Sequence, residues 1–356
     1  MARAGGENMT YSVPGLEAYM VLGQELFRRI YAEESPEEIH RWLMSQVQRV
    51  GGDETGARLL WQDSFDLYEN IMQKRIEQSR IPESQRKILS WPWATWQKLL
   101  DPLDPGLLAV LSAADGAGKT LYSENIAEYW AKSGMNVVFV HFELNRALML
   151  DRRMVRHSGI NRRILKTGEI DSSQKEKIER ANDYLRSWPG SITYVHTPGW
   201  TMERVMGEVG NLVSADLCDV FVIDYLEKAA ASSNQIKTIG NNIFAREADN
   251  VEIVKRTAEA LERPALLLAQ LSKMGKQQSF DNLDRTSIRG AGEKTERANI
   301  VILLYKESSD SQIVQVRIDK NTMGACGSFE QFMDGSKFLV ADIQKQEENY
   351  GAYNPE

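Results

Sequence analysis

The stretch LLAVLSAADGAGKT, residues 107–120, decides the fold of this chain. It begins with the apolar run 107–111, which predicts a buried strand, and a helical pattern follows Thr120. Between them lies a loop of small residues that ends in Lys119 and Thr120. This order of strand, loop and helix is typical of a P-loop, in which backbone N–H groups and the positive end of a helix surround phosphates.

The loop therefore predicts a site for a nucleoside triphosphate. Lys119 is expected to reach the outer phosphates and Thr120 to hold Mg²⁺. The other residues that we expect to bind the nucleotide are Ala114, Asp115, Gly116, Ala117, Gly118 and Leu121. The strict pattern begins with Gly, whereas this one begins with Ala113, so the surrounding sequence has to support the assignment.

The composition allows one large domain and a smaller appendage. With 356 residues, 42% of them hydrophobic, the chain can hardly form three domains. A net charge of -7 argues against a chain that coats nucleic acid non-specifically, although a local basic loop inside a ring could still bind nucleic acid. Cys218 and Cys326 have no spacing typical of disulfides or structural zinc. No membrane-span pattern or signal peptide is seen, so we expect a soluble, cytoplasmic protein without membrane contact.

Residues 1–90 are predicted to form a helical N-terminal arm. Ser35 and Glu38 have the spacing of a capping box, which predicts a helix that begins at Pro36. An arm of this size is expected to pack on the main domain or on a neighbouring subunit. The predicted helices cover 15–33, 36–50 and 55–80.

Residues 91–345 are predicted to form an α/β domain with a mostly parallel sheet flanked by helices, because apolar runs alternate with helical patterns. A long polar connection lies between Leu271 and Ile300, and structureless connections of this length are usually functional or disordered. Residues 346–356 are expected to form a flexible tail. The predicted strands are 107–112, 137–142, 192–196, 220–224, 265–271, 300–305, 313–319 and 337–341.

Polar residues end three of these strands, at the sheet edge where open α/β folds bind ligands. Asp224 follows VFVI and is expected to support Mg²⁺ through water, although an Asp here could also cap the next turn. Glu143 is our candidate for the base that orients the attacking water, and the alternative is a residue that begins the next helix. Gln270 could sense the γ-phosphate and pass its state to the long connection.

The order P-loop, Glu143, Asp224, Gln270 resembles that of RecA-type ATPases and, in detail, that of the DnaB-like replicative helicases. The resemblance covers most of the chain. It implies a RecA-like fold, ATP and Mg²⁺ as cofactors, and a ring-shaped homo-oligomer, usually a hexamer, on single-stranded DNA. The matching stretches are FELNRALMLDRRM, LKTGEI, VIDYLE, LLAQLSK and SIRGAGEKTERANIVILLYK.

Further roles come from the same resemblance. Arg152 would lie near the nucleotide, and Lys320, at the end of strand 313–319, would reach ATP bound by the neighbouring subunit. The stretch AEESPEEI looks like the linker helix region that docks on the adjacent subunit. A channel loop that follows the phosphodiester backbone would contain Lys273, Lys276, Arg289, Gly290 and Gly292.

Two features depart from the family pattern. Only about fifteen residues precede the predicted linker helix, where the family normally has a globular helical domain, so primase recruitment by the usual surface is not expected. The family motif Lys-x-Arg-x-Gly is here Lys320-Asn321-Thr322-Met323-Gly324, so Thr322 replaces the finger Arg. Hydrolysis could then be slow, depend on Lys320 or use Arg317, although Arg317 is expected to face opposite to Lys320 on an alternating strand.

The leading hypothesis is a hexameric ATPase that moves along single-stranded DNA and unwinds duplex DNA. The alternative is a RecA-like oligomeric regulatory or assembly ATPase that binds nucleotide without unwinding, for which Thr322 is the main argument. A P-loop phosphotransferase is less favoured, because no Arg-rich lid follows the loop. A loader or another replication protein is a possible further partner.

Overall fold

The computed structural model describes residues 63–81, 88–143 and 146–343, together with a few separate residues between 26 and 42. The chain separates into two units, Met1–Arg80 and Ile81–Glu356. Helix α3 (Asp63–Arg80) belongs to the first unit. Most of the predicted helices 15–33 and 36–50 and the predicted tail lie outside the described residues. No described helix is both long and apolar enough to cross a bilayer.

Ser35 and Glu38 form the predicted capping box. The backbone N–H of Glu38 donates to Ser35 Oγ at 3.3 Å, and the backbone N–H of Ser35 donates to Glu38 Oε2 at 3.1 Å. The exchange satisfies two backbone donors that a helix start leaves without intrahelical partners. This local prediction is confirmed, because it depends only on residues close together in the sequence.

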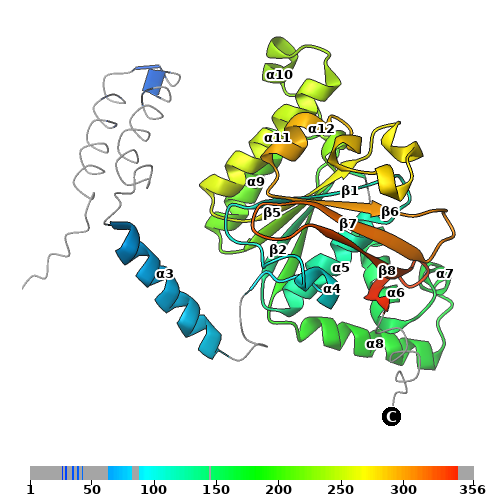
Figure 1. Ribbon diagram of the computed structural model, residues 1–356. Helices are drawn as coiled ribbons and strands as arrows, with labels where there is room; N and C mark the ends of the chain where they lie inside the picture. Colours follow the sequence, from blue (N-terminus) through cyan, green and yellow to red (C-terminus); the bar gives the residue numbers. More distant parts are fainter. Residues whose placement is uncertain are drawn as a thin grey trace, which may run out of the picture. The chain divides into compact units, whose positions relative to one another are not determined.

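The described strands of the second unit form one sheet in the order β3-β2-β4-β5-β1-β6-β7-β8-β9. From β3 to β6 in that order neighbouring strands are parallel, and β7, β8 and β9 extend the sheet in antiparallel fashion (Figure 1). The bounds are β1 (Leu108–Ala113), β2 (Asn136–His141), β3 (Ser191–His196), β4 (Val220–Asp224), β5 (Ala265–Gln270), β6 (Ile300–Tyr305), β7 (Ile313–Asn321), β8 (Gly327–Asp334) and β9 (Leu339–Asp342).

The prediction of eight strands missed β8. Its sequence GSFEQFMD begins with a Gly and has few apolar residues, so it shows neither an apolar run nor a clear alternation. Its backbone nevertheless pairs with β7 on one side and β9 on the other. Strand formation here depends on these two neighbours, which the local pattern does not show.

Helices cover both faces of the sheet, so the sheet is buried on both sides (Figure 1). On one face, α5 packs with strand residues such as Leu111 and Leu268. On the opposite face, α9 and α11 pack with Val110 and Leu267. The helix bounds are α4 (Ala94–Gln97), α5 (Lys119–Lys132), α6 (Arg146–Ser158), α7 (Arg162–Thr167), α8 (Ser172–Arg186), α9 (Met202–Ser214), α10 (Ser233–Thr238), α11 (Ile243–Ala260) and α12 (Ala291–Arg297).

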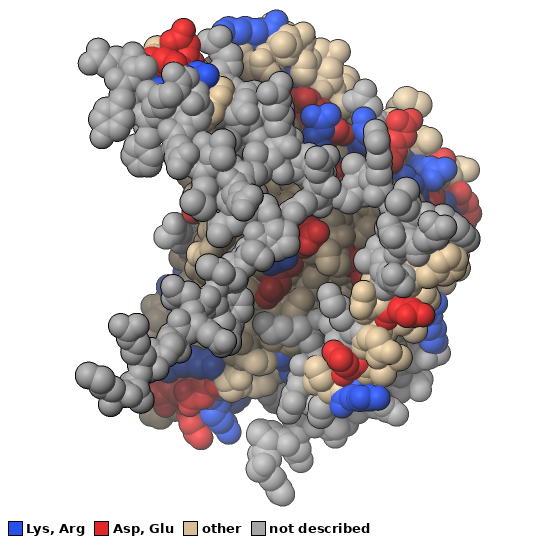
Figure 2. Space-filling view, turned by 90° about the vertical axis from the view of Figure 1, so that its left-hand side faces the viewer, with Lys and Arg blue, Asp and Glu red and all other residues tan. Residues whose placement is uncertain are grey.

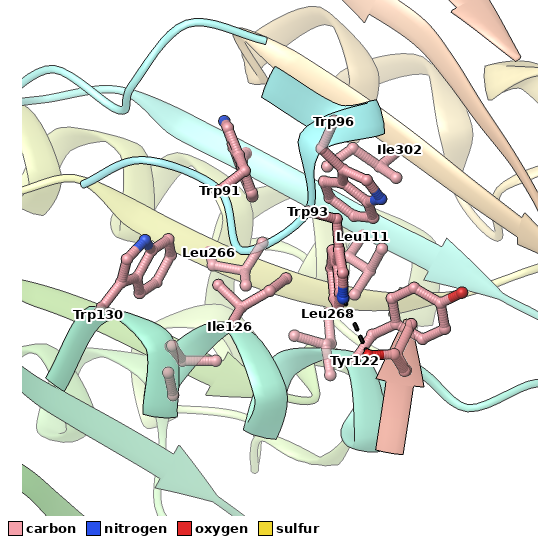
Figure 3. Packing of buried hydrophobic residues seen from close by; sticks show 14 of the residues in the cluster. Trp91, Trp93, Trp96, Leu111, Tyr122, Ile126, Trp130, Leu266, Leu268 and Ile302 are labelled. Atoms are coloured by element: carbon pink, nitrogen blue, oxygen red, sulfur yellow. Dashed lines mark hydrogen bonds between the residues drawn. The ribbon is translucent and has the colours of Figure 1, made fainter. Parts of the chain in front are cut away.

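A tryptophan-rich cluster joins the segment before β1 to α5 and to the last strands. Trp91 and Trp96 are fully buried and lie beside Trp130 and Tyr122 of α5 (Figure 3). The indole of Trp96 donates to Gln331 Oε1 of β8 at 2.8 Å. These rings supply a large apolar area with satisfied N–H groups, so they attach the far strands β8 and β9 to the P-loop helix.

The connection between β5 and β6 has secondary structure, so the expectation of a structureless loop is wrong. It contains three short 3₁₀ helices and α12. An antiparallel bridge joins Leu271 and Ile288, and the backbone N–H of Ser272 donates to the carbonyl oxygen of Ser287 at 2.8 Å. The connection can be ordered in spite of its polar sequence because its backbone groups find partners within the domain.

Candidate nucleotide site

The loop between β1 and α5 has the backbone of a phosphate cradle. Gly116 and Gly118 have φ values of 76° and 101°, which residues with a Cβ rarely adopt. A Cβ on Gly118 would also lie 2.6 Å from the sulfur of Met333 on β8. The backbone conformation therefore requires glycine at Gly118, and a side chain there would also displace the flexible Met333 side chain. The N-terminus of α5 follows at once, so its free N–H groups face the loop.

Lys119 is buried within this cradle. Its Nζ donates to the carbonyl oxygens of Ala113 at 2.8 Å and of Ala114 at 3.2 Å. Burial lowers the pKa of Lys119, and the nearby carboxylates of Asp115, Glu227 and Asp224 oppose that effect. A buried cation held by two carbonyl dipoles is well suited to exchange them for an anionic phosphate.

A pocket of about 660 Å³ opens beside the loop and brings most of the predicted site residues together. It lies where the carboxyl ends of the parallel strands meet, as expected for an open α/β sheet. The predicted residues that line it are Asp115, Gly116, Gly118, Lys119, Thr120, Leu121, Glu143, Arg152 and Gln270. Ala114, Ala117 and Asp224 are not among the lining residues.

Asp224 lies at the end of β4 and is 5% exposed. Burial raises its pKa to about 7, and a hydrogen bond from Thr120 acts in the opposite direction. Its Oδ1 has no hydrogen-bond partner among the residues that the structure describes. A buried carboxylate oxygen without a partner next to a threonine hydroxyl fits a hard divalent cation, which would offset the cost of the buried charge.

Glu143 follows β2 at the edge of the pocket, and its side chain is 45% exposed. Its Oε1 accepts a hydrogen bond from the Tyr225 hydroxyl at 3.1 Å and lies 2.5 Å from Lys228 Nζ. The hydrogen bond from Lys228 to Glu143 raises the pKa of Lys228. The carboxylate is thus held by two polar groups that follow β4, where it faces the mouth of the pocket.

Gln270 connects the pocket to the segment 271–299. Its backbone N–H donates to Glu227 Oε1 at 3.1 Å, and its carbonyl oxygen accepts from the backbone N–H of Arg289 at 2.9 Å. A displacement of Gln270 would therefore act directly on Arg289. Gln270 was predicted to pass its state to this connection, and that role stays a prediction.

The basic residues of this segment lie in different places. Lys276 Nζ lies 2.5 Å from Asp115 Oδ2 of the phosphate loop. Arg289 forms an ion pair with Glu247 at 3.1 Å and lies over the ring of Phe244. Lys273 is exposed. Gly290 precedes α12 with φ 63°, and Gly292 is exposed within that helix.

Charged side chains of both signs are interspersed on the face shown in Figure 2, without one broad basic patch among the residues described there.

Arg317 and Lys320 lie on the same face of the sheet, so the prediction that they face opposite sides is wrong. The β6–β7 register shifts, and Lys320 pairs with Val301 while Arg317 pairs with Leu303. Val301 and Leu303 both belong to the cluster packed on α9 and α11. Asp319 is the extra residue of a β-bulge, which breaks the alternation.

Lys320 contacts its own chain. Its Nζ donates to the carbonyl oxygens of Thr295 at 2.8 Å and Glu296 at 3.0 Å, near the end of α12. The guanidinium of Arg317 lies over the ring of Phe280, 4.5 Å from its centroid. Both cations thus reach the segment between β5 and β6, and contact of Lys320 with a neighbour's nucleotide stays a prediction.

Several residues that line the pocket were not predicted. Lys306 follows β6, so the search for polar residues at strand ends could have found it. Tyr225 comes directly after Asp224 and could have been found in the same way. The others follow β6 or belong to β8 and the turn after it, and no local sequence signal marks them: Ser309, Met333, Gly335 and Phe338.

A buried ionic cluster behind the pocket was also missed. Glu128 of α5 pairs with Arg156 at 2.6 Å, with His157 at 2.9 Å and with Arg153 at 3.3 Å, all on α6. Burial alone would raise the pKa of Glu128, but Arg156, His157 and Arg153 together lower it to about 2. Helices α5 and α6 are therefore joined by ion pairs that are largely shielded from solvent.

We expect Glu128→Gln to lower the free energy of unfolding at pH 7 by about 3 kcal/mol, because the buried Arg156 loses one of its two carboxylate partners and Arg153 loses its ion pair. A carboxylate with a depressed pKa stabilises the fold above its unfolded pKa, near 4.5, and loses this effect as the pH falls toward 2. Urea denaturation of both proteins should therefore show a gap that shrinks to less than half near pH 3. Glu179→Gln on the exposed side of α8 is the control, and a gap independent of pH would contradict the assignment.

Comparison with known proteins gives a consistent result. A family profile described as the DnaB-like helicase C terminal domain matches residues 93–338. The replicative DNA helicase DnaB of Geobacillus stearothermophilus is 26% identical over 233 residues, which cover 63% of this chain and 49% of that protein. The replicative DNA helicase DnaC of Bacillus subtilis is 26% identical over 232 residues, covering 62% and 49%. The chain thus spans about half the length of these relatives.

Solved structures share the fold. An isolated ATPase domain superimposes with a TM-score of 0.67 at 17% identity, covering 78% of this chain and 98% of that one. A DnaB-like replicative helicase, solved in a study of its interactions with primase, gives a TM-score of 0.70 at 15% identity, covering 92% of this chain and 76% of that one. These similarities confirm the predicted α/β fold.

Proposed function

The chain belongs to the DnaB-like helicase family, and we propose that it is an ATP-driven translocase that moves along single-stranded DNA and unwinds duplex DNA. The observation that carries the proposal is the hydrogen bond from Arg289 to Gln270, because it joins the nucleotide pocket to the segment predicted to contact DNA. A motor needs such a connection, since binding at one site must change the other.

ATP would bind with its phosphates in the loop 113–120. Lys119 would leave the carbonyl oxygens of Ala113 and Ala114 for the outer phosphates. Thr120 and Asp224 are the residues that would hold Mg²⁺, Asp224 through water. The ion, when bound, supplies positive charge that neutralises the phosphate oxygens during transfer.

Glu143 would act as the general base. It borders the pocket beside Tyr225, and its carboxylate can accept a proton from a water that attacks the γ-phosphate. Lys228 and Tyr225 would have to release one oxygen of Glu143 for this step. Gln270, at the end of β5, would sense whether the γ-phosphate is present and transmit this to Arg289.

DNA would be contacted by the segment between β5 and β6, through Lys273, Arg289, Gly290 and Gly292. Lys276 is bound to Asp115 and would join them only after leaving the phosphate loop. We further propose a ring of identical subunits, with six as the expected number, in which Lys320 leaves α12 and reaches the ATP of the neighbour. A cytoplasmic location and contact with a loader or another replication protein belong to the same proposal.

The test is steady-state ATP hydrolysis with and without single-stranded DNA. We expect the wild-type rate to rise several-fold with DNA, and Lys119→Ala serves as the blank. The double variant with Arg289→Ala and Lys273→Ala should weaken DNA binding and remove the stimulation of hydrolysis by DNA. The number of counter-ions released on DNA binding, obtained from the salt dependence of the affinity, should fall by up to about two. The matched control changes Lys175 and Lys177, exposed on α8, to Ala. Unchanged DNA binding in the first double variant would contradict the proposed DNA contact.

Two features favour a second function. Thr322 stands where the family has its finger Arg, and Lys320 is bound to its own chain. An oligomeric regulatory or assembly ATPase would tolerate both. It would bind ATP, but DNA would not stimulate its ATP hydrolysis, so the same hydrolysis experiment separates the two functions.

A further inference from the structure

One wall of the nucleotide pocket comes from the end of β8 and the turn that follows it. Met333, Gly335 and Phe338 line the pocket beside Leu121. The polar residues Lys119, Glu143 and Gln270 line other parts of the same pocket. The apolar wall therefore suits the uncharged, aromatic part of a nucleotide, its nucleoside.

Arg152 belongs to this wall. Its guanidinium lies 5.3 Å from the centroid of the Phe338 ring and also lines the pocket. Phe338 has φ 54°, a conformation that costs free energy for a bulky residue and persists only where the surroundings enforce it. The guanidinium of Arg152 thus lies over the Phe338 ring at the pocket, and Phe338 is held in a strained turn.

Arg156 enforces this turn from behind. Its Nε donates to the carbonyl oxygen of Phe338 at 2.6 Å, and Asn125 Nδ2 donates to the same oxygen at 3.1 Å. Arg156 is itself almost completely buried, with a side chain that is 5% exposed. Its guanidinium can therefore take few other positions.

Glu124 of α5 joins the two arginines. One of its oxygens lies 2.8 Å from Arg156 and the other lies 3.2 Å from Arg152. Glu124 is 4% exposed, and burial raises its pKa while Arg156 and Arg152 oppose that effect. The single buried carboxylate of Glu124 on α5 thus fixes the positions of two arginines. Arg152 lines the pocket, and Arg156 holds Phe338.

We propose that Glu124 and Arg156 are positioning residues, which hold Arg152 and Phe338 as the surface that receives the nucleoside of ATP. The inference rests on the proposed function of the pocket as an ATP site. It assigns to the ion pairs of Glu124 with Arg152 and Arg156 a role in selecting a nucleoside triphosphate over a triphosphate alone.

The test compares Mg-ATP with Mg-tripolyphosphate by titration calorimetry, because the second ligand has phosphates without a nucleoside. We expect Glu124→Gln and Phe338→Ala to weaken ATP binding roughly tenfold and to leave tripolyphosphate binding within about twofold. Arg156→Lys should act in the same way, since it keeps the buried charge and loses the geometry of the guanidinium. Glu124→Gln should add little in a Phe338→Ala background, because both changes remove one contact surface.

Arg153→Gln is the matched control. Arg153 lies in the same cluster, but it pairs with Glu128 and Tyr194 and does not line the pocket, so both ligands should bind as before. Equal weakening of both ligands in Glu124→Gln and Arg156→Lys, or no weakening of ATP, would overturn the inference alone. If the wild-type protein binds neither ligand, the proposed function of the pocket fails instead.

Discussion

Lys119→Ala is expected to lower the rate of ATP hydrolysis by about 10²- to 10³-fold. The ammonium is a buried charge beside the loop 113–120, and in the proposed mechanism it would stabilise negative charge on the transferred phosphoryl group. Its present partners are neutral carbonyl groups, so it is available to the nucleotide. Phosphate release from radiolabelled ATP measures the rate.

The control for this variant is Lys132→Ala. Lys132 lies on the same helix, at its exposed C-terminal end, so any effect of losing a lysine from α5 would appear there too. Its rate should match the wild type. If Lys119→Ala hydrolysed ATP at the wild-type rate, the loop 113–120 would not be the phosphate site.

Glu143→Gln should reduce hydrolysis by about 10³-fold while ATP binding stays within a few-fold of the wild type. The amide keeps the shape of the side chain and can still meet Lys228 and Tyr225, but it cannot take a proton from water. The expected signature is therefore a large loss of kcat with little change in the affinity for ATP. Single-turnover hydrolysis and calorimetry measure these two quantities.

Glu179→Gln, at an exposed position of α8, tests whether an arbitrary loss of one carboxylate has any effect. A second outcome is informative for Glu143 itself. If the Gln variant retained more than about a tenth of the rate, against the loss expected of a general base, the carboxylate would not be the base. The ion pair with Lys228 would then be a structural contact only.

The two variants divide the proposed site into binding and chemistry. Lys119→Ala should affect both ATP affinity and rate, because its charge faces the phosphates in the bound and in the reacting state. Glu143→Gln should affect the rate alone. A protein in which both variants bound ATP normally and hydrolysed it normally would have its ATPase centre elsewhere.

Most of the parallel sheet was predictable. The strands that carry the P-loop, Glu143, Asp224 and Gln270 are apolar runs buried on both faces, and their polar residues come where each strand ends. Parallel connection through helices brings those ends to one edge of the sheet. The chain order of these groups was enough to predict the RecA-like fold, which the solved structures of similar ATPase domains confirm.

The antiparallel part of the sheet was predicted less well, because its features depend on contacts between residues that are far apart in the sequence. Strand β8 forms because β7 and β9 provide backbone partners, although its own pattern is weak. The bulge at Asp319 turns Lys320 to the same face of the sheet as Arg317, and no residue type in the sequence indicates this bulge. The polar connection after Leu271 is ordered by a bridge to Ile288.

The sequence by itself determined the order of strand, loop and helix around Lys119, the strand-end residues and the family, because these depend on residue types at fixed spacing along the chain. The tertiary structure alone decided which side chains surround them. Phe338 lies between β8 and β9, the last two strands of the sheet. It reaches the pocket because this turn contacts α5, where Asn125 donates a hydrogen bond to the Phe338 carbonyl oxygen. Glu124 and Arg156 meet because α5 and α6 pack together. Their charges can be buried away from water only because the two side chains pair with each other.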